Sequence, residues 1–452
     1  MEDKIKIQAV FSIWLKILIF CVLLVFISVP VYARSASPDQ QSAYEAAMDG
    51  HYDKAIAILK KSEDDPYSKF LLSCIALSEG NLDMAEHYAD VFRKREPYIP
   101  DGKVLYELIE ERKAYPAEPW TVSFASAWKA AGSPDMKATY DFFMAPLIEE
   151  KASSKASHEG CDIPQSVAGT SNELLLANAC GGKEIVELCL THGSPEAPLA
   201  IKLIALAKLN YYAQNDSKIP AGLLKRAQKR RRELVQELSE KYPDYAEFAL
   251  MREMDRTSTE KTFSLVDIEE LEKALSRPKF GPATDKLYED YLARFIAMGT
   301  PDPITQAANA VWGQVIDNSN LGLGGFGKKV ISTAKKYPQL KERLAAILQK
   351  LGEARLRDHS LIGLLCAEAT FGWEADLTGI KTKKYRALLN YSRELISHVD
   401  FYSPLDSGFD LAIRPLRDDR IERAMKNELG LYKLFYDVEM PPEYKNLLNG
   451  SQ

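Results

Sequence analysis

The sequence contains few of the patterns that predict β-strands. Alternating runs of Val, Ile and Thr are scarce, whereas apolar residues recur with helical spacing through most of the 452 residues. Tyr52, Ala55, Ile56 and Leu59, for example, lie at positions i, i+3, i+4 and i+7 and form one stripe of a helix. We therefore expect an all-α protein.

The sequence also lacks the short motifs that carry common catalytic chemistry, because HExxH, GxSxG and CxxCH are all absent. One segment, Gly322–Lys329, matches two phosphate-binding patterns by letter, G-x-G-x-x-G and G-x-x-x-x-G-K. Phosphate binding requires a strand before the glycines, but the preceding residues 307–317 have helical spacing. The segment is predicted to be a flexible loop between helices, and no cofactor is expected.

Neither charge nor hydropathy is extreme. The chain is 46% hydrophobic and 27% charged, with a net charge of −6, which argues against nucleic acid as a partner. Beyond the first 34 residues no comparable apolar run occurs. About 420 further residues can bury a large core and form two or three domains.

The N-terminus predicts export. Lys4, Lys6 and Lys16 precede an apolar run over residues 17–29, and Pro30 and a small residue, Ala33, follow it. This order is typical of a secretory signal peptide, here residues 1–33. In a double-membrane bacterium the destination would be the periplasm. The alternative is an uncleaved helix over residues 10–33 that anchors a scaffold in the inner membrane.

Six cysteines occur, and Cys21 leaves with a cleaved signal peptide. Cys74 and Cys366 lie in apolar helical runs and are predicted to be small buried side chains. The other three cysteines are Cys161, Cys180 and Cys189. In an oxidising compartment two of them are expected to form one disulfide, whose pairing the sequence does not determine.

The same region offers a weaker metal site. His158 and His192 flank the three cysteines, and imidazole and thiolate groups suit tetrahedral zinc. The paired cysteine spacing of structural zinc sites is missing, however, because Cys180 stands alone. A metal site and free thiols are therefore alternatives to the disulfide.

One basic run stands out in the middle of the chain. Six cations occupy eight positions: Lys225, Arg226, Lys229, Arg230, Arg231 and Arg232. Glu233 and Glu237 follow at spacings that allow ion pairs along a helix. We expect a solvated, salt-bridged helix face. The alternative is contact with an anion, such as phospholipid headgroups, an acidic wall polymer or an acidic partner.

Two short segments near the N-terminus share a pattern. Each has a glycine, a large apolar residue two positions later and an alanine five positions later, and each is followed by a proline. The residues are Gly50, Tyr52, Ala55 and Pro66 in one segment and Gly80, Leu82, Ala85 and Pro97 in the other. Residues 40–98 thereby resemble tetratricopeptide repeats, although the units are 30 residues apart rather than about 34. Two generic helical hairpins are the alternative.

Helical spacing continues to the C-terminus. Helices are predicted at 196–213, 221–242, 244–254, 266–275, 284–298, 304–317, 328–336, 339–351, 359–371, 383–398 and 416–436. Two Tyr-Pro joints, at 242–243 and 337–338, each connect two helices, with the proline expected to begin the second. Recurring joints of this kind favour a solenoid-like stack of hairpins.

These patterns suggest four segments. They are a signal peptide or anchor at 1–33, tetratricopeptide-like hairpins at 34–115, a connecting segment with a polar linker at 116–160, and an α-helical domain at 161–452. The resemblance implies a protein or peptide partner in the cell envelope, held by a non-enzymatic adaptor or assembly factor. The alternative is an envelope enzyme acting on cell wall or polysaccharide with the repeats as a docking arm. The oligomeric state is left open.

Overall fold

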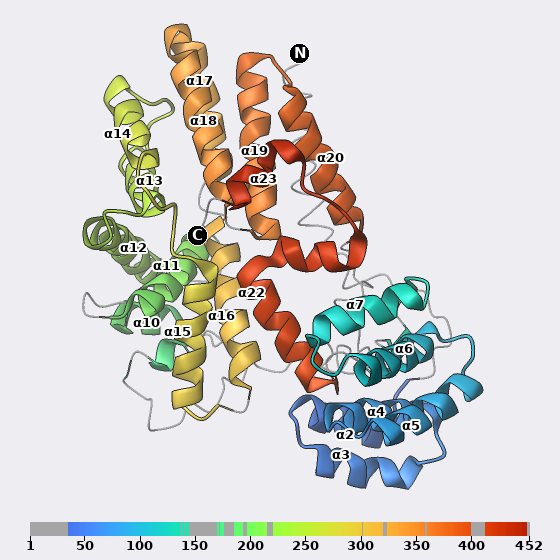
Figure 1. The fold of residues 1–452 in the computed structure, drawn as a ribbon. Coiled ribbons are helices and arrows are strands. Elements are labelled where there is room, and N and C mark those ends of the chain that lie inside the picture. The colour runs from blue at the N-terminus through green and yellow to red at the C-terminus, as the bar shows by residue number, and fades with distance from the viewer. Residues whose placement is uncertain are drawn as a thin grey trace.

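The structure is a computed structural model. It describes residues 35–136, 138–139, 141–143, 170, 172–175, 185–192, 197–214, 220–300, 302–319, 323–357, 359–398 and 412–449. These residues form helices joined by short turns and contain no strand, apart from one isolated bridge between Tyr245 and Lys279. The predicted all-α fold is confirmed (Figure 1).

The first group of helices forms antiparallel pairs. Its members are α2 (Pro38–Met48), α3 (Tyr52–Leu59), the 3-10 turn η1 (Lys60–Ser62), α4 (Pro66–Ser78), α5 (Leu82–Arg95), α6 (Pro100–Ala114) and α7 (Trp120–Ala130). Gly50 and Gly80 have φ of 78° and 77°, a conformation that lets glycine end one helix just before the next begins. Ala55 and Ala85 are fully buried between the paired helices. The hairpins therefore lie where the repeated pattern places them.

The second group contains further packed helix pairs. Its members are α10 (Ile185–His192), α11 (Leu199–Gln214), α12 (Ala221–Lys241), α13 (Ala246–Arg256), α14 (Leu265–Leu275), α15 (Thr284–Ala297) and α16 (Pro303–Ser319). The Tyr-Pro joint after α12 differs from the prediction, because α13 begins at Ala246 and not at Pro243. Tyr242, Tyr245 and Phe248 pack together there, so an aromatic cluster lengthens the turn.

The last group runs back across the molecule. Its members are α17 (Leu323–Lys336), the 3-10 turn η3 (Pro338–Leu340), α18 (Lys341–Leu356), α19 (Leu361–Thr378), α20 (Lys383–His398), α22 (Arg414–Tyr436) and α23 (Pro442–Asn449). At the second Tyr-Pro joint, Pro338 begins η3 and α18 follows it directly. None of the described helices combines the length and apolar character needed to cross a bilayer.

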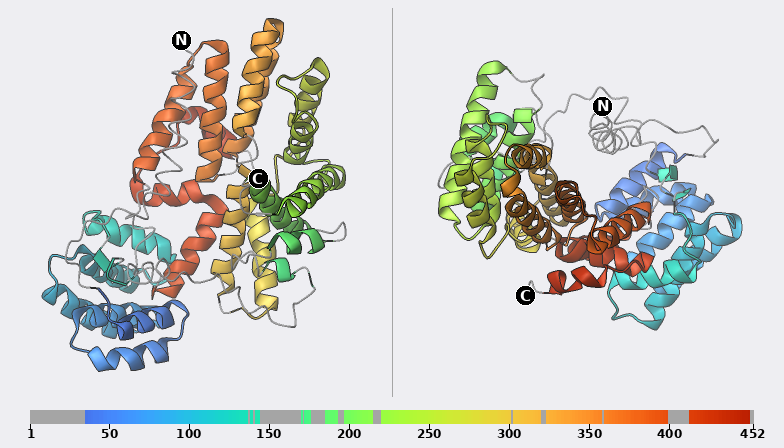
Figure 2. Two further views of the ribbon diagram at one scale, coloured as in Figure 1. Left: turned by 180° about the vertical axis from the view of Figure 1, so that it is seen from behind. Right: turned by 90° about the horizontal axis from the view of Figure 1, so that it is seen from above.

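Helix α22 joins the two ends of the molecule. In Figure 1 it runs between the blue and cyan helices α2–α7 and the yellow helices α15 and α16, and the view from above in Figure 2 places the orange and red helices between the other two groups. Leu416 and Phe435 of α22 enter the core of the N-terminal helices, whereas Ile421 and Met425 enter the core around α11 and α16. One helix thus contributes to two hydrophobic cores.

Candidate binding cavity

A cavity of ≈ 660 Å³ lies between two helical hairpins of the described structure. Its walls come mainly from α12 and α13 on one side and from α17 and α18 on the other, with Asn210 of α11 and Phe280 completing them. A cavity of this size is in the range of sites that enclose small ligands.

The pattern of α12 explains why it presents a charged face here. Its apolar residues Ala227, Leu234 and Leu238 are completely buried against neighbouring helices. The intervening positions must then face other surroundings, because side chains three or four apart share a face. Arg231 and Arg232, from the predicted basic run, consequently line the cavity.

The interior surface of the cavity is mostly apolar. Leu250, Met251 and Met254 contribute from α13, Phe326 from α17 and Leu351 from α18. Of these, Leu351 is 3% and Phe326 4% exposed, so the walls are held by packing behind them. Methionine side chains adapt their shape readily, which suits a surface that has to fit a ligand.

Two arginines hold two of the three carboxylates that line the cavity. Arg231 donates to the Asp255 carboxylate and to Oδ1 of Asn210. The Arg355 guanidinium lies 3.9 Å from the Glu247 carboxylate and stacks over the Phe280 ring at 4.6 Å. The negative charges of Asp255 and Glu247 are therefore neutralised by arginines of the protein itself.

Three buried polar atoms around the cavity have no hydrogen-bond partner within the described part of the chain. They are Nδ2 of Asn210, Oδ2 of Asp255 and Nε of Arg355. Asn210 is only 1% exposed, and its Oδ1 is already held by Arg231. A buried polar atom without a partner costs free energy, about 1–3 kcal/mol. Each of these atoms has almost no accessible surface, so it lies behind the cavity wall and does not face the cavity.

The glycine-rich segment does not form the predicted flexible loop. Its residues from Leu323 onward belong to α17, so that expectation was wrong. A side chain at position 327 would overlap the Trp373 ring of α19, which shows that Gly327 permits close packing of the two helices. Tertiary packing therefore overrides the low helix propensity of glycine.

Lys329, the last residue of the glycine-rich segment, contacts other parts of the protein. It is buried, and its ammonium donates to the Thr257 carbonyl and lies 4.4 Å from the centre of the Phe263 ring. Burial lowers the pKa of this lysine, and the nearby Glu260 carboxylate counters that effect. Lys329 thus ties α17 to the turn after α13.

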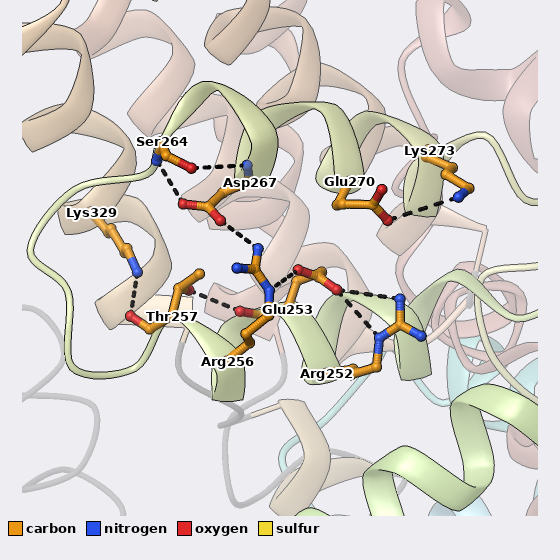
Figure 3. A network of polar contacts seen from close by, with 9 residues as sticks. All are labelled: Arg252, Glu253, Arg256, Thr257, Ser264, Asp267, Glu270, Lys273 and Lys329. Carbon is orange, nitrogen blue, oxygen red and sulfur yellow. Dashed lines mark hydrogen bonds and ion pairs between the residues drawn. The ribbon is translucent and has the colours of Figure 1, made fainter.

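A polar network joins α13, α14 and the turn between them (Figure 3). The buried carboxylate of Glu253 accepts hydrogen bonds from Arg252 at 3.3 Å and from Arg256 at 2.8 Å, and Arg256 also donates to Asp267. Asp267 closes a capping box with Ser264 at the start of α14. Although burial acts to raise it, hydrogen bonds from Ser264 and Arg256 lower the pKa of Asp267. The network fixes the relative position of α13 and α14.

No protein-family model matches this chain, and no curated protein or solved structure matches it either. The resemblance to tetratricopeptide repeats therefore rests on the sequence pattern of residues 40–98 and on the helix pairs found there.

The N-terminal hairpins are partly covered by the chain itself. Arg417 of α22 is 5% exposed, donates to the Met48 carbonyl at 2.9 Å and pairs with Asp302 at 3.3 Å. Asp419 accepts a hydrogen bond from the Thr121 amide at the start of α7. Helix α22 therefore packs against this end of the hairpins that were predicted to bind a partner.

Most members of the basic run form the expected ion pairs. Arg230 binds Glu237 at 2.7 Å, Lys229 lies 3.7 Å from Glu233, and Arg226 lies 3.7 Å from Glu187. Lys225 and Arg232 are exposed and have no ion-pair partner among the described residues. The salt-bridged face is therefore present, and Arg232 is left available at the cavity.

The cysteine and histidine candidates are only partly described. His158, Cys161 and Cys180 lie outside the described residues, as do residues 149–160, the polar part of the predicted connecting segment. Cys189 is a buried free thiol whose pKa is raised to about 12 by burial, and His192 ends α10. Within the described residues, no group of His, Cys, Asp or Glu side chains could hold a metal ion.

Cys74 and Cys366 have the buried positions predicted for them. Sequence reasoning missed most of the cavity, including Asn210, Met254 and Arg355. Asn210 and Met254 belong to predicted helices, and Arg355 lies in the last turn of α18, past the predicted helix end at residue 351. No local pattern indicates which helix faces which.

Proposed function

We propose that this protein is a non-enzymatic binding protein of the cell envelope whose ligand is held in the cavity between α12–α13 and α17–α18. The cavity is the observation that supports the proposal. A polar network joins α13 and α14 beside the cavity, which combines an apolar interior with exposed cations.

The proposal includes the adaptor role expected from the sequence, but it changes the surface that contacts the partner. Because α22 packs against the N-terminal hairpins, a protein or peptide partner would contact their remaining outer surface rather than the face that α22 covers. The basic run on α12 supports the further proposal of peripheral contact with a membrane or an acidic wall polymer.

Export itself rests on residues 1–33, which lie outside the described residues. A chain that begins at Arg34 after export would exclude the anchor over residues 10–33, and N-terminal sequencing of the mature protein makes this distinction.

An envelope enzyme acting on wall or polysaccharide is the second candidate. Glycoside cleavage uses a pair of carboxyl groups on opposite sides of the scissile bond. Of the three carboxylates that line the cavity, Asp255 and Glu247 are held by arginines, and only Glu260 lies outside these ion pairs. Binding is therefore the function that this geometry favours.

A photo-cross-linking experiment tests the cavity as a binding site. A diazirine amino acid replaces Ser332, an exposed residue that lines the cavity, and the protein is irradiated in its native envelope. We expect an adduct that disappears when Gly325→Trp fills the cavity, because open space surrounds that glycine.

Gly222→Trp is the matched control, because Gly222 is also a helical glycine with open space around it but does not line the cavity. The adduct should persist in this variant. An adduct that survives Gly325→Trp, or no adduct in any sample, contradicts the proposed site.

A further inference from the structure

We propose that the ligand of the cavity is a small amphipathic organic acid, an apolar body that carries one anionic head group. This inference rests on the proposed function and gives the chemical class of its ligand. The apolar walls, the charge and the exposed hydrogen-bond donors of the cavity support it.

The apolar part of the ligand has a matching surface. Met254, Phe326 and Leu351 lie on opposite walls and provide aliphatic, thioether and aromatic contacts. Such a surface stabilises an alkyl or aryl group by removing it from water, by about 25 cal/mol for each Å² buried. A purely polar or highly charged ligand would gain nothing from these walls.

The charge of the cavity favours an anion, although the whole chain is negative. Six cationic side chains line it, against the three carboxylates of Glu247, Asp255 and Glu260. Arg231 and Arg355 are engaged with two of these carboxylates, and Lys329 binds a backbone carbonyl. Arg232, Lys261 and Lys328 are then the surplus cations.

These three cations are all exposed, and none has an ion-pair partner among the residues described. They come from α12, from the turn after α13 and from α17, which are three sides of one opening. Together they attract a negative head group over a distance of about 8–10 Å at moderate salt. A cationic ligand would be repelled.

Hydrogen bonding gives the third argument. The Arg232 guanidinium and the ammonium groups of Lys261 and Lys328 are exposed donors at the cavity. A carboxylate or another oxygen-rich anionic group supplies acceptors for such donors, and hydrogen bonds to a charged group are stronger than neutral ones. An alkane or an ammonium ion supplies none.

The test uses the full chain and three probes with the same tail but different head groups. Decanoate, decanol and decyltrimethylammonium are titrated below their micelle concentrations by isothermal calorimetry. We expect decanoate to bind at least about tenfold more tightly than decanol and decyltrimethylammonium not to bind. Decanoate binding should weaken with added salt, as expected for attraction to exposed cations.

Substitutions test whether the cations at the cavity cause the preference for decanoate. The double variant Arg232→Gln and Lys328→Gln should weaken decanoate binding by about fivefold to tenfold and leave decanol binding unchanged. Lys225→Gln is the matched control, because Lys225 is an exposed, unpaired cation on the same helix that does not line the cavity. Gly325→Trp should abolish binding of both probes, and Gly222→Trp should not.

The outcomes separate this inference from the proposed function. If decanol binds as tightly as decanoate and Gly325→Trp blocks both, the anionic class is wrong but the cavity remains a binding site. If none of the probes binds while the Ser332 adduct persists in the envelope, the inference fails and the proposed function stands. If decanoate binding survives Gly325→Trp, binding occurs elsewhere and the inference is also overturned.

Discussion

Asp101 shows how a single residue links two segments of the N-terminal region. It lies in the first turn of α6 and is completely buried, and its Oδ2 accepts hydrogen bonds from the amide and hydroxyl of Thr139. Its Oδ1 has no partner among the described residues. Burial raises the pKa of Asp101 to about 6, against 3.8 for an unperturbed aspartate, although the Thr139 hydrogen bonds act to lower it.

The raised pKa predicts a pH dependence with a defined sign. Between about pH 4 and about pH 6 the folded state binds more protons at Asp101 than the unfolded state does, so folding stability falls as pH rises. From about pH 4 to about pH 7 this group should remove about 2 kcal/mol from the free energy of unfolding. The Asp101→Asn variant should keep its stability over this pH range, because an amide does not titrate there. Its amide oxygen can still accept hydrogen bonds from Thr139.

Urea unfolding of both proteins at the two pH values measures the effect. Other titrating groups are shared by the two chains, so the difference between them isolates Asp101. A difference that stays constant with pH would show that Asp101 is not buried in the folded protein.

The packing of α17 against α19 depends on a glycine at one position, Gly327. A Cβ at Gly327 would overlap the Trp373 ring, whereas a Cβ at Gly325, half a turn earlier on the same helix, would meet nothing within 4 Å. The two glycines have equal intrinsic helix propensity, so only their neighbours differ.

Alanine at the two positions should therefore have opposite effects. Gly327→Ala should destabilise the fold by about 1–3 kcal/mol, because the indole ring has to move. Gly325→Ala should stabilise it by up to about 1 kcal/mol through better helix propensity. Chemical unfolding monitored by tryptophan fluorescence measures both, and equal effects would contradict the close packing.

The whole molecule is held together by a core that residues distant in the sequence share. Buried side chains between Ala36 and Phe143 form one cluster with those between Leu356 and Tyr444. Phe435 of α22 meets Phe124 at 5.7 Å and Trp128 at 6.0 Å between ring centres. The N-terminal hairpins and the C-terminal helices should therefore unfold together.

Phe435→Ala tests this dependence. We expect a loss of about 3–5 kcal/mol in stability. Amide hydrogen exchange should accelerate in α7 as well as in α22, although these helices are far apart in sequence. The control is Ile296→Ala, which removes a side chain that is 60% exposed and should change little. Acceleration confined to α22 would mean that the N-terminal hairpins are stable alone.

Helix positions were the part of the fold that local sequence determined best. Each predicted C-terminal helix has a counterpart in the structure, since apolar spacing of 3.6 residues is a property of consecutive residues. The glycine-rich segment and the Pro243 joint were exceptions, because Trp373 and the Tyr242 cluster, which the local pattern does not include, decide those conformations.

The candidate site was predictable only in fragments. Arg231 and Arg232 belong to a basic run, and Lys328 belongs to a pattern that resembles a phosphate-binding motif. Nothing in the sequence places these residues around one cavity. Their meeting depends on how α12–α13 and α17–α18 pack. That packing depends on contacts between residues distant in the sequence, such as Thr257 with Lys329 and Phe263 with Thr333, which are 72 and 70 positions apart. The sequence alone thus determined the helices and the expectation of export, whereas tertiary packing decided the cavity, because its walls exist only where distant helices meet.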